Sequence, residues 1–337
     1  MRIALNGFGR IGKNFLRSVL SDKKALSILQ VVVINVGKGD PEAAALAFKY
    51  DSLMGTYPGA VSYSQGKLHI DDVSIAVVRE LDPSKAPWKN YSIDWVVEAS
   101  GHFTSREGAS KHIESDAHNV LITAPAKDED ITIIPGVNLS AYKKESHKIV
   151  SLGSCTSNAL FLMLKVLNDS FGIIQASMTT VHAYTNTQPL LDVDSSISDL
   201  RRGRAAALNI VPTTTGAMDV VGRLMPELSG KIFGCSLRVP VAKVSLIDCT
   251  AFLGTSLTKE SVNKAFLDAS KTVMKGLIEY TDLPLVSSDY SGNGHSVVID
   301  SLMTQAQGNF AKVFGWYDNE WGYSERVKDF LLFVARG

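Results

Sequence analysis

The first half of the chain alternates between short apolar runs and longer stretches in which apolar positions recur with helical spacing. The apolar runs have the length of strands and cover residues 3–5, 31–34, 93–99 and 120–125. Strands separated by helices are typical of an α/β unit, in which helices cover a parallel sheet. We therefore predict a mostly parallel, doubly wound sheet for this half.

The second half has a different pattern. Residues 176–185 alternate like a half-buried strand, and further strand-like runs lie at residues 237–240, 244–252 and 297–302. These runs predict a mostly antiparallel sheet. The chain closes with an amphipathic stretch at residues 324–335, which predicts a packing helix.

A glycine-rich turn joins the first predicted strand to the first predicted helix. Residues 6–12 read Asn-Gly-Phe-Gly-Arg-Ile-Gly and follow the strand at residues 3–5. Gly7 permits a tight turn, Gly9 lets the backbone approach a pyrophosphate, and Gly12 allows close packing of helix and strand. The helix N-terminus then receives the phosphates. This order predicts a dinucleotide site, and the alternative is a glycine turn in an unrelated α/β unit.

The end of the second strand leaves the choice of dinucleotide open. An acidic residue normally binds the adenosine ribose there, but residues 35–38 read Asn-Val-Gly-Lys. Asn35 could bond a ribose, and Lys38 could attract a 2′-phosphate or be a solvated loop cation. Ser100 and Thr123 end later strands. They are candidates for contacts in the same cleft, or simply small residues at strand ends.

One cysteine stands at the predicted start of a helix. Residues 151–158 read Ser-Leu-Gly-Ser-Cys-Thr-Ser-Asn and precede residues 159–167, which are apolar except for Lys165. The free N–H groups and the dipole at a helix N-terminus stabilise a thiolate, and a thiolate attacks a carbonyl carbon. The pattern therefore offers Cys155 as a nucleophile. The alternative is a structural cysteine in a helix cap.

Other polar residues of the second half are candidate partners of this thiol. His182 lies near the end of the strand at residues 176–185 and could act as its base, although a lone histidine is more often structural. Residues 199–204 are basic, and residues 211–216 and Arg238 add hydroxyls and a further guanidinium. Arginine and threonine side chains are good ligands for phosphate. Alternatively, the arginines form a solvated face or salt bridges between subunits.

Composition and charge narrow the class of protein. The 337 residues suffice for two domains, and 34 basic residues balance 34 acidic ones, which argues against general binding to nucleic acid or to a membrane surface. Three widely spaced cysteines give neither a disulfide framework nor a zinc site, and Cys235 and Cys249 lie in apolar runs typical of core thiols. No segment has the pattern of a signal peptide or a membrane span. We therefore expect a cytoplasmic protein without a metal ion, whose Cys155 stays a free thiol.

These motifs, taken in order, resemble one family. The resemblance is carried by residues 6–12, 154–158, 182–185, 200–206, 212–217, 238–240 and 316–324. They are similar to phosphorylating glyceraldehyde-3-phosphate dehydrogenase over essentially the whole chain. The resemblance implies a Rossmann dinucleotide-binding domain over residues 1–153, on which a C-terminal helix at residues 319–337 packs back. It also implies an α+β catalytic domain over residues 154–318 and a homotetramer.

The resemblance assigns roles to individual residues. Cys155 matches the nucleophile and His182 its activator. Thr185 and Arg238 match contacts to the phosphate of the substrate. Groups around inorganic phosphate are matched by Ser154, Thr156, Arg202, Thr215 and Gly216. Contacts to the cofactor are matched by Arg10, Ile11, Thr123 and Asn319, which join Gly7, Gly9, Gly12, Asn35 and Ser100 as cofactor candidates.

Two departures from the family concern the adenosine end of the cofactor. Val36 replaces the ribose-binding Asp of the family. Leu81 replaces the Arg of its usual Glu-Arg-Asp-Pro run, with Arg79 nearby as a substitute. The resemblance implies NAD as cofactor, and the replacement at Val36 extends the expectation to NADP.

The implied activity is the oxidation of glyceraldehyde 3-phosphate, with inorganic phosphate, to 1,3-bisphosphoglycerate in glycolysis or gluconeogenesis. Attack by Cys155 gives a hemithioacetal, loss of hydride to the nicotinamide gives a thioester, and phosphate releases the acyl phosphate. The nearest alternative is erythrose-4-phosphate dehydrogenase, which uses water in place of phosphate. Another alternative is a Rossmann-type binding protein that uses its cofactor cleft for RNA. Intact Cys155 and His182 argue against a loss of chemistry, and the balanced charge means that nucleic acid is not expected as a partner.

Overall fold

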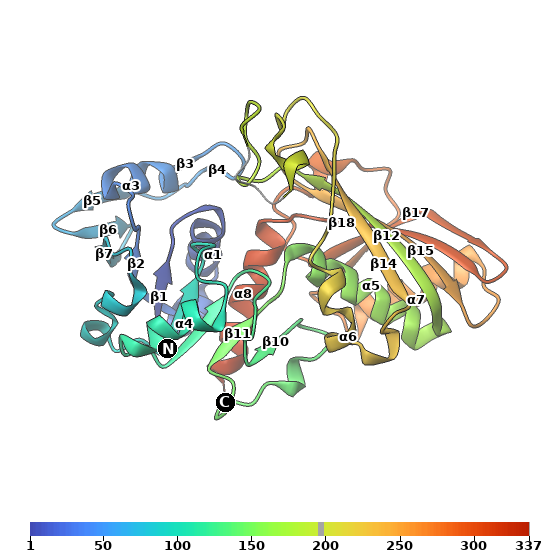
Figure 1. Ribbon diagram of the computed structural model, residues 1–337, viewed down its shortest axis with the longest axis horizontal. Coiled ribbons are helices and arrows are strands. Elements are labelled where there is room, and N and C mark those ends of the chain that lie inside the picture. Colours follow the sequence, from blue (N-terminus) through green and yellow to red (C-terminus); the bar gives the residue numbers. More distant parts are fainter. Residues whose placement is uncertain (195–198, 337) are drawn as a thin grey trace. The chain divides into compact units, whose positions relative to one another are not determined.

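The computed structural model describes residues 1–194 and 199–336, which form two compact units (Figure 1). Unit 1 comprises Met1–Ile133, Ser140–Gly153 and Ser324–Gly337, and unit 2 comprises Ile134–Leu139 and Ser154–Tyr323. The units differ from the expected domains in two places, because residues 134–139 and 319–323 lie in unit 2. Gly337, the end of the predicted C-terminal helix, lies outside the described residues.

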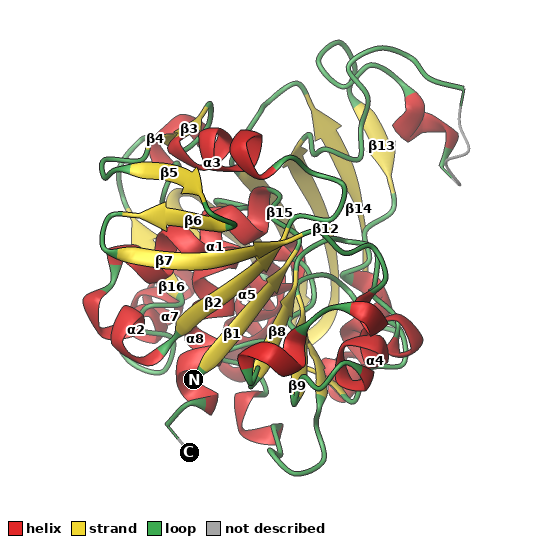
Figure 2. Ribbon diagram, turned by 90° about the vertical axis from the view of Figure 1, so that its left-hand side faces the viewer, coloured by secondary structure: helices red, strands yellow, loops and turns green. Residues whose placement is uncertain are grey.

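Unit 1 contains a mostly parallel sheet. The strands of this sheet are β1 (Arg2–Asn6), β2 (Gln30–Asn35), β5 (Val61–Ser64), β6 (Lys67–Ile70), β7 (Val73–Val78), β8 (Trp95–Glu98), β9 (Asn119–Ile122), β10 (Ile131–Thr132) and β11 (Ile149–Ser151). They lie in the order β10-β11-β9-β8-β1-β2-β7-β6-β5, and β3 (Tyr50–Asp51) and β4 (Gly55–Thr56) form a separate hairpin. Pairing is parallel from β10 to β7 and antiparallel at β6. The predicted α/β sheet is confirmed, and Figure 2 shows its central strands side by side.

The helices of unit 1 begin where the sequence supplies caps. They are α1 (Arg10–Ser21), α2 (Lys23–Ile28), α3 (Pro41–Lys49) and α4 (Arg106–Glu114). Asp22, Asp40 and Ser105 accept hydrogen bonds from backbone N–H groups in the first turns of α2, α3 and α4. Each cap satisfies donors that have no partner within the helix. The start of α1 is different, since its N-cap residue is a glycine.

The last helix, α8 (Trp321–Val334), belongs to unit 1 from Ser324 onward. Val327, Phe330 and Leu331 are fully buried. The Phe330 ring meets Trp95 edge to face, with 5.6 Å between ring centroids. Burial of this apolar face confirms the predicted packing helix and explains why the chain end returns to the first unit.

Unit 2 contains a mostly antiparallel sheet. Its strands are β12 (Ile173–Ala183), β13 (Val211–Thr213), β14 (Ile232–Val239), β15 (Ser245–Leu253), β16 (Ile278–Thr281), β17 (Val297–Gln307) and β18 (Phe310–Tyr317). They lie in the order β13-β14-β12-β15-β18-β17-β16. The β12–β14 and β16–β17 pairs are parallel, and the other neighbouring pairs are antiparallel. The prediction from the strand pattern is confirmed.

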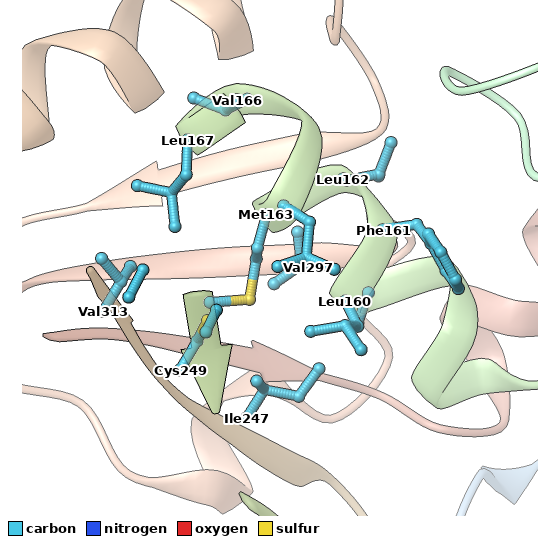
Figure 3. Packing of buried hydrophobic residues seen from close by; sticks show 14 of the residues in the cluster. Leu160, Phe161, Leu162, Met163, Val166, Leu167, Ile247, Cys249, Val297 and Val313 are labelled. Atoms are coloured by element: carbon cyan, nitrogen blue, oxygen red, sulfur yellow. The ribbon is translucent and has the colours of Figure 1, made fainter. Parts of the chain in front are cut away.

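A buried helix, α5 (Cys155–Phe171), packs on this sheet, and unit 2 also contains α6 (Val221–Leu224) and α7 (Lys259–Lys271). Leu160 and Met163 of α5 are fully buried in one cluster with Ile247 and Cys249 of β15 (Figure 3). Cys249 is a core thiol, as predicted. The same prediction for Cys235 is wrong: this residue is exposed, on the same face of β14 as the exposed Phe233.

Candidate functional site

The glycine turn after β1 closes tightly against the end of β8. Gly7 has a φ of +99°, and a Cβ there would lie 2.5 Å from the backbone nitrogen of Ser100. A Cβ on Gly12 would lie 2.3 Å from the carbonyl oxygen of Gly7. Any side chain at either position collides with backbone, so this turn and the close helix–strand packing both require glycine.

Gly9 and the start of α1 leave room for a phosphate group. A Cβ on Gly9 would have no atom of the described residues within 4 Å, and Gly9 gives α1 no side-chain cap. The N-cap of this 12-residue helix thus has no side chain that would stand between a phosphate group and the positive end of the helix dipole. The geometry fits the pyrophosphate of a dinucleotide. In the first turn of α1, Arg10 pairs with Asp51, and Ile11 follows it.

Asn35 ends β2, and its hydrogen-bonding capacity is used within unit 1. Its Nδ2 donates to Asn6 Oδ1 at 2.7 Å and to the Glu80 carbonyl oxygen at 2.8 Å. Its Oδ1 accepts from the backbone nitrogens of Gly37 at 3.0 Å and Glu80 at 2.9 Å. The side chain therefore shapes the loop, and a ribose could bond to it only by displacing one of these partners. Its contact with a cofactor stays a prediction.

Ser100 and Thr123 are both held by Glu98, the last residue of β8. Ser100 donates its N–H at 2.8 Å and its hydroxyl to Glu98 Oε1. Thr123 donates its hydroxyl to the Glu98 carbonyl oxygen at 3.0 Å. The sequence reasoning did not single out Glu98. A glutamate at the end of an apolar run is the signal that could have found it, because charged side chains are rarely buried without partners.

Cys155 and His182 meet although 27 positions separate them in the sequence. Cys155 is the first residue of α5, and the N-cap Ser154 accepts the Ser157 N–H at 3.0 Å. The Cys155 Sγ lies 3.6 Å from Nε2 of His182, near the end of β12. At this distance a proton can pass from sulfur to nitrogen, so the geometry suits a nucleophile and its base.

Arg238 lies beside this histidine because β14 pairs in parallel with β12 and places the two residues opposite each other. Its Nη1 is 2.7 Å from Nδ1 of His182 and 3.0 Å from the carbonyl oxygen of Ala183. The same Nδ1 lies 2.6 Å from that carbonyl oxygen. A guanidinium only donates, so its bond needs a lone pair on Nδ1, whereas the carbonyl needs a proton there. Only the tautomer with the proton on Nδ1 leaves Nε2 able to accept the thiol proton.

Burial sets the charge state of the thiol and the imidazole. Burial raises the pKa of Cys155, against the opposing effects of the Arg238 charge and the hydrogen bonds of Thr156. Burial and then the Arg238 charge lower the pKa of His182 from 6.5 to about 3. Near neutral pH the pair is therefore a neutral thiol and a neutral imidazole. This differs from the thiolate expected from the sequence, because desolvation outweighs the donors of the helix N-terminus.

Tyr317, the last residue of β18, is part of the site and was missed by the sequence reasoning. Its hydroxyl oxygen lies 3.0 Å from Thr156 Oγ1 and 2.7 Å from Thr180 Oγ1. Its ring packs edge to face on His182, with 5.9 Å between centroids. Tyr317 thus ties the first turn of α5 to β12, and burial raises its pKa, so it stays a phenol. A polar aromatic residue at the end of an alternating strand was the signal available.

The remaining residues predicted to bind phosphate lie after β12 and β13. Arg202 donates Nε to Thr213 Oγ1 at 2.8 Å and Nη2 to the Thr214 carbonyl oxygen at 3.3 Å. The same segments carry Thr185, Thr215 and Gly216. Their roles toward phosphate stay predictions.

Asn319, a predicted cofactor contact, lies in unit 2. Its Oδ1 accepts from Ser245 Oγ at 3.2 Å, and this hydroxyl oxygen in turn accepts the Ala183 N–H at 3.1 Å. The Asn319 amide is therefore oriented by the strand end that carries His182. Its contact with the cofactor stays a prediction.

Comparison with known proteins finds the same family for both halves of the chain. Residues 154–319 match the family described as "Glyceraldehyde 3-phosphate dehydrogenase, C-terminal domain", and residues 1–106 match its "NAD binding domain". The chain belongs to the glyceraldehyde-3-phosphate dehydrogenase family. It is 46% identical over 337 residues to glyceraldehyde-3-phosphate dehydrogenase 2 of Trichormus variabilis, covering 99% of this chain and 98% of that protein. It is 45% identical over 336 residues to glyceraldehyde-3-phosphate dehydrogenase 2 of Bacillus subtilis, covering 99% and 97%.

The resemblance seen in the sequence is thereby confirmed, and the match to an NAD binding domain agrees with the fit of the glycine turn to a dinucleotide. Within residues 1–194 and 199–336, no group of three or more His, Cys, Asp or Glu side chains could hold a metal ion. Over those same residues, no helix combines the length and the apolar character needed to cross a bilayer.

Proposed function

We propose that this member of the family oxidises glyceraldehyde 3-phosphate to 1,3-bisphosphoglycerate, with inorganic phosphate as second substrate and NAD as hydride acceptor. The reaction serves glycolysis or gluconeogenesis. Family membership over both halves of the chain supports this activity. The observation that carries it is the Cys155 Sγ placed 3.6 Å from His182 Nε2 at the start of α5.

The proposed chemistry uses the chain's own thiol and imidazole. Cys155 sulfur attacks the aldehyde carbon while its proton passes to Nε2 of His182. Backbone N–H groups at the start of α5 stabilise the oxyanion of the hemithioacetal. Bound NAD supplies the acceptor for the hydride. The Cys155 thioester left behind is attacked by a phosphate oxygen at its carbonyl carbon, the thiolate leaves beside the protonated His182, and one proton is released overall.

Arg238 links substrate binding to this proton transfer. We propose that Arg238 and Thr185 bind the phosphate of the substrate. When that phosphate takes the guanidinium donors, the Nδ1 proton of His182 can bond the Ala183 carbonyl without competition. Nε2 is then free to accept the thiol proton. Substrate binding would thus both orient the aldehyde and prepare its base.

Phosphate dependence is the experiment that tests the proposal. The proposed ligands of inorganic phosphate are Ser154, Thr156, Arg202, Thr215 and Gly216. Steady-state NADH formation from glyceraldehyde 3-phosphate should require inorganic phosphate. Turnover that is equally fast without phosphate would instead indicate attack by water, as in erythrose-4-phosphate dehydrogenase. If neither glyceraldehyde 3-phosphate nor erythrose 4-phosphate gives NADH, the result would point to a Rossmann-type binding protein that uses its cofactor cleft for RNA.

The choice between NAD and NADP follows from the loop after β2. The proposed cofactor contacts are Gly7, Gly9, Arg10, Ile11, Gly12, Asn35, Ser100, Thr123 and Asn319. Val36 offers no acid to repel a 2′-phosphate, and Arg79 donates to the Lys38 carbonyl oxygen at 3.4 Å, which brings two cationic residues to one loop. These features support acceptance of NADP beside NAD. Separate calorimetric titrations of the apo protein with NAD and NADP measure the difference directly.

A homotetramer in the cytoplasm completes the proposal. Large apolar side chains are exposed around the arginine-bearing segment, at Leu190, Leu191, Leu200, Leu208 and Ile210. An apolar surface of this kind is typical of contacts between subunits. Light scattering should therefore give four times the mass of the chain. A reducing cytoplasm would keep Cys155 as the thiol that the reaction needs.

A further inference from the structure

A buried carboxylate lies at the carboxyl end of β8, where the mechanism above makes no use of it. Glu98 is 1% exposed. Its Oε1 accepts the N–H of Ser100 at 2.8 Å and the Ser100 hydroxyl. Its Oε2 accepts Nδ2 of Asn6 at 2.6 Å and contacts Nε2 of His112 at 3.0 Å. Each carboxylate oxygen therefore has two partners, which fills its capacity.

The partners fix the protonation of the histidine. Trp88 Nε1 donates to His112 Nδ1 at 3.0 Å, and both side chains are fully buried. An indole N–H only donates, so Nδ1 holds a lone pair and the imidazole proton sits on Nε2, where it faces Glu98. All four donors to the carboxylate are then neutral groups whose dipoles point at it.

This network extends to the dinucleotide edge of unit 1. Asn6 Oδ1 accepts Asn35 Nδ2 at 2.7 Å, so Glu98 is connected through Asn6 to the end of β2. Ser100 N is the atom nearest to a Cβ on Gly7, at 2.5 Å. A shift of Ser100 would therefore shift the glycine turn as well. The ends of β1, β2 and β8 are thus held by one side chain.

We propose that Glu98 is a positioning residue for the dinucleotide, which holds Asn6, Ser100 and the adjoining glycine turn in the binding form without touching the cofactor. The inference rests on the proposed function, because it assumes that this edge binds NAD. A carboxylate is needed because all the groups around it donate. In Glu98→Gln, either orientation of the amide would point its N–H₂ group at two of these donors. His112 could accept a hydrogen bond from that group only if its proton moved to Nδ1, which would break the hydrogen bond from Trp88.

The test compares two variants that each replace a carboxylate by an amide. Glu98→Gln should raise the KM for NAD, and the calorimetric Kd, about tenfold or more, since buried donors lose their acceptor at the binding edge. At saturating NAD its kcat should stay within about twofold, and alkylation of Cys155 without NAD should keep its wild-type rate. The control is Asp130→Asn. Asp130 accepts hydrogen bonds from the N–H groups of Lys148 and Ile149, both at 2.7 Å. These lie at the N-terminal end of β11, whereas Glu98 lies at the carboxyl end of β8. This variant should lose stability but keep the wild-type KM for NAD.

Three results would overturn the inference. They are a folded Glu98→Gln protein with the wild-type Kd for NAD, an equal rise in KM in Asp130→Asn, and a loss confined to kcat. If Glu98→Gln does not fold, Asn6→Ala removes one donor and the link to Asn35. It should weaken NAD binding in the same direction, and an unchanged Kd there would overturn the inference too. A wild-type protein without NAD-dependent activity would instead sink the proposed function, so the two failures are distinguishable.

Discussion

The dinucleotide edge of unit 1 and the thiol site of unit 2 use their polar groups in opposite ways. At the edge, Glu98 and Asn35 spend their hydrogen-bonding capacity on the protein itself, and Gly9 leaves open space for the ligand. At the thiol site, Cys155 contacts His182 at 3.6 Å, and Arg238 competes with a carbonyl for Nδ1 of that histidine. The polar side chains of the dinucleotide edge are hydrogen-bonded to other protein groups, whereas those of the thiol site can exchange their present partners for reactants.

This difference separates binding from chemistry. The hydrogen bonds around Glu98 and Asn35 hold the backbone of the glycine turn in one position, so substitutions in this network should appear in the KM for NAD. The thiol of Cys155 and the imidazole of His182 can exchange a proton in the chemical step, so changes to them should appear in kcat. The guanidinium of Arg238 pairs with the charge of the substrate, so its loss should appear in the KM for that substrate. The predictions below test this division.

The largest expected effect is that of Cys155→Ser. Its kcat should fall by several orders of magnitude, because a hydroxyl is a far poorer nucleophile than a thiol near neutral pH. Its Kd for NAD should stay unchanged, since Cys155 is not one of the proposed cofactor contacts. Steady-state rates and calorimetry measure the two quantities. Cys235→Ser, at an exposed thiol of β14, is the matched control and should behave like wild type. Wild-type turnover in Cys155→Ser would remove the thiol from the mechanism.

The next largest effect should separate the two phosphates. Arg238→Ala removes a charged donor worth about 1.5–3 kcal/mol, so the KM for glyceraldehyde 3-phosphate should rise roughly 10- to 150-fold. Arg202→Ala should raise the KM for inorganic phosphate and leave that for the aldehyde near wild type. Initial rates with each substrate varied in turn give both constants. The assignment fails if the two variants change the same constant.

A smaller effect is expected at the adenosine end. Val36→Asp places a carboxylate where a ribose or a 2′-phosphate would lie, so affinity for NADP should fall roughly tenfold while that for NAD rises or holds. Lys38→Ala, its neighbour in the same loop, should weaken NADP alone. Parallel titrations of each variant with NAD and with NADP measure these affinities. Equal changes for NAD and NADP in Val36→Asp would place the 2′-group elsewhere.

The smallest expected effect concerns stability toward acid. In the folded protein the pKa of His182 is about 3, against an ordinary value of 6.5. Between these values the unfolded chain binds a proton that the folded chain does not, so the contribution of His182 to stability is full above 6.5 and is lost as pH falls toward about 3. His182→Asn should lose less unfolding free energy than wild type between about pH 7.5 and about pH 5. Urea denaturation at both pH values measures this, and parallel losses would contradict the buried neutral imidazole.

Local patterns made the fold of both units predictable. The strand at residues 3–5 and the glycines after it fall in one stretch of chain, and the steric demand on Gly12 arises within that stretch, from the carbonyl oxygen of Gly7. The demand on Gly7 comes from Ser100, which is distant in sequence. The buried character of α5 could likewise be foreseen, since residues 159–167 are apolar except for Lys165. Cys155 at its first position followed from the same boundary.

Contacts between distant strands were not predictable in this way. Tyr317 joins the site because β18 pairs with β15, and its hydroxyl group reaches Thr180 on β12, the next strand along. Glu98 contacts His112, which in turn accepts from Trp88, because a strand end, an α-helix and a 3-10 helix converge. Cys235 lies in an apolar run yet is exposed, because burial depends on which face of a strand is covered. The hydrophobic periodicity of one segment does not show which other segments pack against it.

The sequence by itself determined the family, the two kinds of sheet and the residues able to carry the chemistry, because these follow from spacing and residue type along the chain. Tertiary structure alone decided the register that sets Arg238 opposite His182, the network around Glu98 and the neutral state of the thiol and imidazole. The physical reason is that register and desolvation depend on groups far apart in sequence. Burial near Cys155 outweighs the helix donors that its local sequence provides.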